Sequence, residues 1–531
     1  MATMAMDTVR IKSLTVLSLL SVIPQITLAG EWQFSPDIFV DEIYSDNVEL
    51  TKTNKVDSLV SQIGLALNTN YKAQYLSFDF NSSSTYAMYT HDHEIDKDFH
   101  TLDSQFSYML WPNGITFTAS AGISNQSRNS ARNGLADIVS GNTVQIENYS
   151  SGLAYNVVNS DFTINSSVQY QITESEDNIG EREGYVASIE SNNGKSARNI
   201  FWNISGSYQD QENNARESTF YQAEVKFGWV SGVGFNPFLR YYDENNEGAS
   251  LGQRSLESNS VGLGIRWLAT PRLYLDISYN KPIGDELNID GEVQDNYLDY
   301  SLSWQPTQRT KLVASYSQRF YGDSYQLALS HENKRLTNTI SYNEAVQTFT
   351  RNNFEAVLQG TYLCPTGEIN NLDECYLSND QNIDPTDIRI LPIYDFELVE
   401  DYGLSLNKSL NWSSTLSLSR TTFSISLNGN ERENLETNLI DTTKSANFNA
   451  SRELGPRSTL KLTLSYTDQE FESNLTIDRS NRYLQASLDY NRELNKQLNA
   501  TFSISTVNRE SEQLYLNYDE NRISFKVTKG F

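Results

Sequence analysis

The sequence predicts an all-β chain that folds as a transmembrane antiparallel β-barrel of about 24 strands (range about 22–26), with both termini on the periplasmic side. Three observations support this prediction. Apolar and polar side chains alternate along most of the chain, short turns alternate with long acidic connections, and Trp is separated from Tyr along the predicted strands. Helical periodicity is almost absent.

The alternation predicts the strands themselves. In FTINSSVQYQI, residues 162–172, the apolar residues Phe162, Ile164 and Val168 share one parity, and the other parity carries Thr, Asn, Ser and Gln. The segments IFWNISGSY, LYLDISY and LKLTLSY repeat this period of two. A strand with this pattern has one apolar and one polar face. A soluble β-sandwich or solenoid and a membrane barrel with a polar lumen could both use such strands.

The connections favour the barrel. Short turns are predicted at WPNG (111–114), VSGVG (230–234), ATPR (269–272), QPTQR (305–309) and LGPRS (454–458). Between them lie longer acidic connections at ESEDNIGERE (174–183), DENNEGAS (243–250), KPIGDELNIDGEVQDN (281–296) and TDQEFESN (467–474). Bacterial outer-membrane barrels have short turns on one rim and long loops on the other.

The aromatic residues indicate two belts. Next to the short turns, or at the start of outgoing strands on the same rim, lie Trp32, Trp111, Trp202, Trp229, Trp267, Trp304 and Trp412. At the opposite strand ends lie Tyr170, Tyr208, Tyr279, Tyr316, Tyr342 and Tyr466. Amphipathic rings favour the two membrane interfaces, whereas a sandwich has no reason to separate Trp from Tyr.

The predicted order begins with a strand leaving the periplasmic rim. Outgoing strands are expected near 32–45, 73–90, 115–126, 161–174, 199–212, 235–246, 272–281, 310–321, 336–350, 414–428, 458–471 and 497–510. Each is followed by a returning strand, the last being 517–531. Pro237 falls inside one of them, which predicts a bulge or a misplaced strand.

Both ends of the sequence carry export signals. Basic residues precede the apolar run LTVLSLLSVI and small residues precede Gly30, so residues 1–29 are expected to be a secretory signal peptide and residues 30–531 the barrel. An anchoring helix is the alternative, but the run is short for one. The segment NRISFKVTKGF ends on Phe531 with alternating apolar residues, and it resembles the signal read by the outer-membrane assembly machinery. Lys529 departs from that pattern.

Composition argues against several functional classes. The net charge of −27 disfavours nucleic-acid binding. His91, His93 and His100 suggest a metal site only weakly, because no ordered set of further ligands accompanies them. Ser and Asp are so frequent that no catalytic triad can be selected. We therefore expect no enzyme activity, no cofactor and no metal.

Cys364 and Cys375, the two cysteines of the chain, lie in its longest connection, residues 351–399. In an exported protein they are expected to form a disulfide, worth about 3 kcal/mol in the loop-closure model. Barrels of about 22 strands are generally plugged. This segment is therefore the expected constriction of the lumen.

The central stretch resembles a known family. WQPTQRTKLVA is followed by SYSQRFYGDSYQLALSHENKRLTNTISYNEAV, Ser315 to Val346, and the chain has WQFSPDIFVDEIYSDNVEL at residues 32–50. These motifs are similar to those of outer-membrane β-barrels associated with the PEP-CTERM/exosortase sorting system. The resemblance implies a bacterium that makes exopolysaccharide and sorts surface proteins, and the motifs themselves are structural.

The same stretch predicts a hairpin that turns at Gly322-Asp323, with Tyr316 and Phe320 on the apolar face. Arg319 has the opposite parity, so it either offers a lumenal cation to cargo or pairs with a lumenal carboxylate that fixes the strand register. Three functions stay open: an export conduit, a general or specific porin, and an enzyme or structural anchor. The expected partners are outer-membrane lipid and lipopolysaccharide, the assembly machinery, and exopolysaccharide or periplasmic export components.

Overall fold

The structure is a computed structural model of the chain. It describes residues 30–531 except 93–95, 113, 131–132, 136, 141–142, 195–196, 214–215, 248–255, 285–287, 290, 349–352, 366–375, 378–387, 400–402, 473–478 and 514–515. The expected signal peptide lies outside the described residues. None of the helical turns in the described part is long and apolar enough to cross a membrane.

The described residues form one large sheet and one small one. The large sheet contains β1 (Glu31–Ser45), β2 (Ser58–Lys72), β3 (Leu76–Tyr89), β4 (Lys97–Trp111), β5 (Ile115–Ser127), β6 (Thr143–Val158), β7 (Thr163–Ser175), β8 (Arg182–Asn192), β9 (Ile200–Glu212), β10 (Glu217–Trp229), β11 (Phe235–Glu247), β12 (Leu256–Glu257), β13 (Ser260–Thr270), β14 (Leu273–Pro282), β15 (Tyr297–Thr307), β16 (Thr310–Arg319), β17 (Gly322–Glu332), β18 (Leu336–Gln347), β22 (Ser405–Ser417), β23 (Thr421–Asn434), β24 (Ile440–Gly455), β25 (Ser458–Phe471), β26 (Arg479–Asn495), β27 (Leu498–Ser511) and β28 (Tyr518–Gly530). The small sheet contains β19 (Asn353–Pro365), β20 (Tyr376–Leu377) and β21 (Ile388–Val399).

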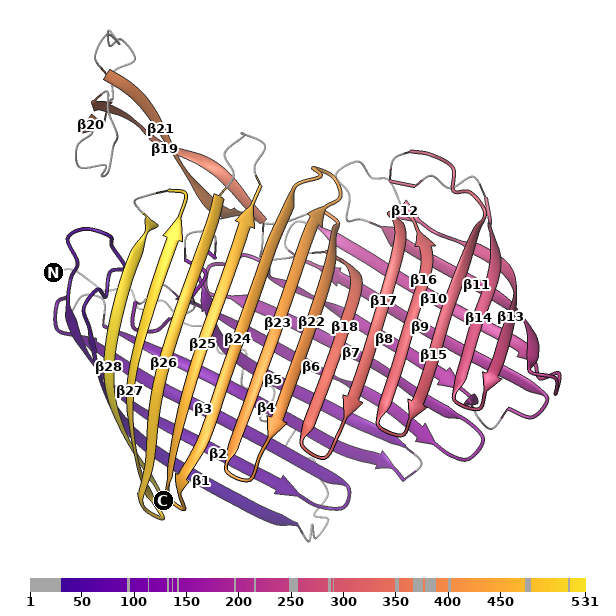
Figure 1. Ribbon diagram of the computed structural model, residues 1–531, viewed down its shortest axis with the longest axis horizontal. Coiled ribbons are helices and arrows are strands. Elements are labelled where there is room, and N and C mark those ends of the chain that lie inside the picture. Colours follow the sequence, from indigo (N-terminus) through magenta and orange to yellow (C-terminus); the bar gives the residue numbers. More distant parts are fainter. Residues whose placement is uncertain are drawn as a thin grey trace, which may run out of the picture.

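The large sheet closes into a ring (Figure 1). Apart from the two-residue β12, each strand pairs antiparallel with the next along the chain, β18 pairs with β22, and β1 pairs with β28 from Asp37↔Gly530 to Ser45↔Arg522. Among the described residues, the ring has 24 strands, which confirms the predicted fold and strand number. A closed ring leaves no unpaired strand edge.

A side-chain contact extends this seam at the long-loop rim. Asp46 follows β1, and its carboxylate accepts hydrogen bonds from the backbone N–H and the side-chain amide of Asn521 at 2.7 and 2.8 Å. Burial raises the pKa of Asp46, but these hydrogen bonds outweigh that effect, so the pKa lies below its ordinary value. The carboxylate therefore keeps its charge, and the seam keeps this contact, until the pH falls below that lowered value.

Strand boundaries agree closely with the sequence prediction, with one exception. The other outgoing strands begin and end within three residues of the expected positions. The segment 414–428, predicted as one strand, instead contains the turn between β22 and β23 at residues 418–420. The prediction missed this turn because residues 418–420 include no Gly, Pro, Asn or Asp to mark it. Pro237 lies inside β11 opposite Ile265 in unbroken register, so the expected bulge is absent there.

The outer face of the ring is apolar. Leu65, Leu263 and Leu484 lie on separate parts of the ring and are 60%, 71% and 58% exposed. All seven Trp residues lie in the halves of their strands toward the short-turn rim, and the Tyr residues named above lie in the halves toward the long loops. An outward apolar band between two aromatic belts is the surface of a membrane-embedded barrel, because water would not stabilise it.

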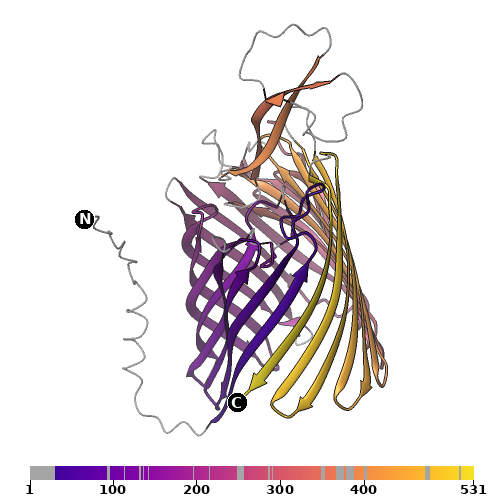
Figure 2. The same ribbon diagram turned by 90° about the vertical axis from the view of Figure 1, so that its left-hand side faces the viewer.

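The barrel is flattened. Figure 1 looks through its short dimension, with β2–β9 behind β15–β18 and β22–β28. One narrow edge is the seam of β1 and β28, and the other is formed by β10–β14 (Figures 1 and 2). At the second edge the rings of Phe201 and Phe238 pack inward at 6.2 Å, over the glycines Gly228 and Gly264. The absence of a Cβ on these glycines leaves the space that the two rings occupy.

Gly264→Ala should lower the stability of the barrel by about 1–3 kcal/mol, the usual cost of overpacking. Its new Cβ would lie 2.3 Å from Cζ of Phe238 and 2.7 Å from the carbonyl oxygen of Ile277. Gly429→Ala is the matched control, because its new Cβ would have no heavy atom of a non-adjacent residue within 4 Å. The measurement is the temperature at which the folded, fast-migrating form disappears on gels. Equal temperatures for both variants would contradict this packing.

Candidate channel and its lumenal strap

The connection between β5 and β6 enters the barrel. We call its described residues 133–135 and 137–140 the strap. The backbone N–H of Gly134 donates to Oη of Tyr483 on β26 at 2.9 Å, and the carbonyl of Ile138 accepts from Oη of Tyr89 on β3 at 2.7 Å. Because β3 and β26 lie on opposite sides of the seam, the strap bridges the inner wall at this narrow edge.

An ion pair holds the strap to β28. The guanidinium of Arg522 binds both carboxylate oxygens of Asp137, one of them at 3.0 Å from Nη1. The same guanidinium binds Glu520 at 2.6 and 2.7 Å, and Ser45 of β1 donates to that carboxylate. Arg522 thus sits between a carboxylate of the wall and a carboxylate of the strap. Two bidentate ion pairs on one planar guanidinium fix the position of the strap as well as its attachment.

An apolar contact holds the other end. Val139 is 5% exposed and packs in a cluster with the inward side chains Ile43, Val60, Tyr89 and Phe99. Burying a Val side chain contributes about 1.5–3 kcal/mol. The strap is therefore fixed by an ion pair on one side of the seam and by apolar burial on the other.

The opposite narrow edge is filled by paired charges. Arg240 of β11 is 2% exposed, and it binds Glu224 of β10 at 2.6 Å and Asp299 of β15 at 3.2 Å. Its Nη2 also donates to Ser317 of β16 at 3.4 Å. A side chain of β11 can reach β16 only because the wall folds back here. The network therefore closes this end of the lumen and joins its two walls.

Arg319 belongs to the same edge. It faces inward, and its guanidinium binds both oxygens of Glu244 on β11, Nε to Oε2 at 2.9 Å. Glu244 is fully buried and Arg319 is 7% exposed. Of the two roles considered for Arg319, this geometry matches pairing with a lumenal carboxylate. Its neighbour Phe320 is not on the apolar outer face as expected. The hairpin turns at Phe320 and Tyr321, two residues earlier than predicted, and Phe320 is buried with Leu256 and Leu404.

The described strands of the segment that was expected to constrict the lumen lie outside the lumen. The sheet of β19, β20 and β21 projects beyond the long-loop rim (Figures 1 and 2). Its base is joined to the barrel by an ion pair of Asp395 with Arg479 at 3.0 Å and by ring packing of Phe354 on Phe471. Within this sheet β19 and β21 pair antiparallel from Asn353↔Val399 to Pro365↔Ile388. These strands do not form the expected constriction.

The remaining predicted residues have clear positions or lie outside the described part. Cys364 is disulfide-bonded, and Cys375, its expected partner, lies outside the described residues. Phe531 follows β28, donates its backbone N–H to the carbonyl of Pro36 at 3.1 Å and is exposed. The ammonium of Lys529 lies 4.8 Å from the centroid of the Phe531 ring. The role of Phe531 in assembly stays a prediction.

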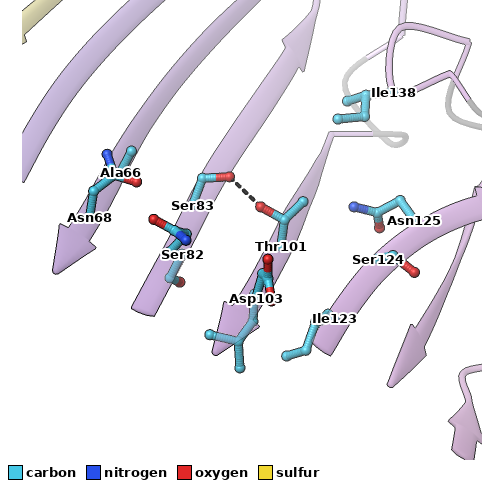
Figure 3. Close-up of a pocket in the computed structure, with 12 residues that line it drawn as sticks. Ala66, Asn68, Ser82, Ser83, Thr101, Asp103, Ile123, Ser124, Asn125 and Ile138 are labelled. Carbon is cyan, nitrogen blue, oxygen red and sulfur yellow. Dashed lines mark hydrogen bonds between the residues drawn. The ribbon is translucent and has the colours of Figure 1, made fainter. Parts of the chain in front are cut away.

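Between the two filled edges lies the open part of the lumen. On the wall of β2–β5 it contains a hollow of about 660 Å³ that is lined largely by Ser, Thr and Asn side chains (Figure 3). Asp103 of β4 and Ile138 of the strap also line it. A second hollow of about 580 Å³ lies along β6–β10, among Asn165, Ser188 and Gln222. Both hollows are therefore polar, and apart from Asp103 and Glu190 the residues that line them are uncharged.

The sequence contains an indication of the strap. The connection SRNSARNGLADIVSGN carries the apolar residues Leu135, Ile138 and Val139 within a long loop. An apolar group in a rim loop needs a surface to cover it, and the inner wall supplies that surface. The acidic ion partner Asp137 alone would not have distinguished it from solvated loops.

Comparison with known proteins gives structural likeness only. No family model and no curated protein matches the chain. Among solved structures it is similar to the siderophore receptor PirA from Acinetobacter baumannii, at 9% identity over 94% of this chain and 80% of that chain, with a TM-score of 0.43. A variant of the ferric enterobactin receptor PfeA from Pseudomonas aeruginosa matches at 12% identity, 94% and 81% coverage and a TM-score of 0.42. A loop-deleted OmpT, an outer membrane protein of Vibrio cholerae, matches at 8% identity, 95% and 100% coverage and 0.32.

Proposed function

We propose that this chain is an outer-membrane channel linked to the export or assembly of exopolysaccharide or of sorted surface proteins. The observation that supports it is the form of the lumen: a ring of 24 described strands that is filled at both narrow edges and polar between them. A purely structural barrel has no need of a lumen that is polar and narrowed by a strap.

The link to surface polymer depends on the resemblance of residues 315–346 to barrels of the PEP-CTERM/exosortase system. Such a channel would receive its cargo from periplasmic export components and would depend on the outer-membrane assembly machinery. Lipid and lipopolysaccharide would surround its apolar band. We assign it no catalytic role, no cofactor and no metal.

A porin that passes small solutes is the second candidate. The strap favours a porin, because a loop folded against the inner wall reduces the width available to a polymer. The two candidates differ in what the cell loses when the protein is absent. Only the export role predicts a loss of polysaccharide and sorted proteins from the cell surface.

Deleting the gene should therefore lower surface polysaccharide and the yield of sorted surface proteins, and the intact gene should restore both. The measurement is the amount of each at the cell surface relative to the parent strain, with total cellular polysaccharide as the control for synthesis. Unchanged surface material together with slower uptake of small solutes would favour the porin. Recovery of the chain as a soluble periplasmic protein would exclude both.

A further inference from the structure

The inner wall between the narrow edges is lined by small neutral groups that bond to one another across strands. Ser83 and Thr101 lie 2.6 Å apart on β3 and β4 (Figure 3), and Ser120 and Ser150 lie 2.7 Å apart on β5 and β6. Further pairs on both walls are Ser167 with Ser188 at 2.9 Å, Thr339 with Ser413 at 2.6 Å and Ser465 with Asn447 at 2.7 Å. The inward positions of β5, β6, β7, β9, β18 and β22 carry no Asp, Glu, Lys or Arg.

The inward arginines at the two narrow edges are paired with carboxylates. Arg240, Arg266, Arg319 and Arg522 each bind a carboxylate there. Their cations are therefore not offered to material in the open lumen. The open walls carry inward lysines at Lys311 and Lys461, but the two hollows are lined by the carboxylates Asp103 and Glu190 and by no Lys or Arg (Figure 3).

We infer that the cargo of this lumen is an uncharged, hydroxyl-rich carbohydrate chain; this inference rests on the proposed function as a channel. A hydroxyl that has paired with its neighbour keeps lone pairs, and one hydroxyl hydrogen of each Ser–Thr or Ser–Ser pair stays available. Sugar hydroxyls can donate and accept in the same way. A neutral hydrogen bond contributes about 0.5–1.5 kcal/mol net, so a neutral chain can exchange contacts along the wall and move. In the two hollows an anionic chain meets the carboxylates of Asp103 and Glu190 and no cation, and at the edges it finds the arginines already bound.

Two oligosaccharides of equal length distinguish these cases. The full chain in planar lipid bilayers would be exposed to maltoheptaose, which is neutral, and to a seven-residue oligogalacturonate at the same concentration and ionic strength. We expect maltoheptaose to interrupt the single-channel current at least tenfold more often. Equal or more frequent interruptions by the oligogalacturonate, or none by maltoheptaose, would overturn the inference.

A charged variant tests the role of the wall itself. Ser150→Lys with Ser188→Lys adds two cations to the open lumen and should raise the frequency of oligogalacturonate events at least fivefold. Thr437→Lys, on the exposed connection between β23 and β24, adds a cation outside the lumen and serves as the matched control. Equal responses of the two variants would show that the wall does not select the cargo.

The proposed function and this inference can fail separately. If the assembled barrel carries no current, the channel function is wrong, and the inference is then tested by calorimetric titration of the detergent-solubilised full chain with the same two oligosaccharides. Binding of maltoheptaose that exceeds binding of the oligogalacturonate supports it. Equal or tighter binding of the anionic oligosaccharide overturns it.

Discussion

Replacing residues 128–142 by a short Gly-Ser linker should raise the single-channel conductance of the barrel several-fold. The strap is held inside the lumen by Asp137 and Val139, and a ring of this strand number leaves a space that wall side chains alone do not fill. Removing it opens the seam end of the flattened lumen. The measurement is conductance in planar bilayers at a fixed salt concentration.

A second loop on the same rim provides the control. Shortening the connection between β7 and β8, residues 176–181, removes chain from the rim but not from the strap, so conductance should stay at the wild-type value. Asp137→Asn removes only the charge of one anchor and should give a smaller increase with more frequent fluctuations. Unchanged conductance in a correctly assembled strap deletion would mean that the strap does not limit the pore.

Arg319→Ala should lower the stability of the barrel by about 3–5 kcal/mol, the cost of leaving a buried charge without its partner. Glu244 is fully buried, and its carboxylate would lose both bonds from the guanidinium. The measurement is the denaturant midpoint of the folded form, or the temperature at which that form is lost on gels.

Two further variants distinguish the loss of the Arg319–Glu244 ion pair from other effects of shortening a side chain. Lys311→Ala changes an exposed cation on the same face of β16 and should shift stability by less than about 0.5 kcal/mol. Arg319→Met with Glu244→Leu removes both charges and should recover most of the loss, since apolar replacement of a buried pair is often neutral. A wild-type midpoint for Arg319→Ala would show that the pair does not join β11 to β16.

The strands could be predicted because their signal is local. Alternation over ten residues sets the two faces of a strand, and a turn such as WPNG sets its end, so most boundaries agree with the structure. The signal fails where turn residues are missing, as at residues 418–420 between β22 and β23. It also fails at Phe320, whose parity predicted the outer face although the chain had already entered the turn.

The lumen could not be predicted in the same way, because its contacts join residues that are distant in the sequence. Arg319 was expected to face inward, but the identity of its partner Glu244 depends on the wall folding back between β11 and β16. The strap depends on Asp137 meeting Arg522, which lies 385 positions later. No local pattern contains that information, although an apolar group in a rim loop was a usable indication.

The pairing of β1 with β28 also has a kinetic consequence. Residues 37–45 find their partners only at residues 522–530, so the contact that closes the sheet has nearly the largest sequence separation this chain allows. Chain-closure entropy makes such contacts late, and folding slows as they contribute more of the contact order. Until they form, two unpaired edges of an apolar sheet are open to other chains. We therefore expect spontaneous refolding to be slow and to compete with aggregation. A catalyst that shields the two edges from other chains should raise the yield of folded barrel more than it changes the stability of the folded barrel.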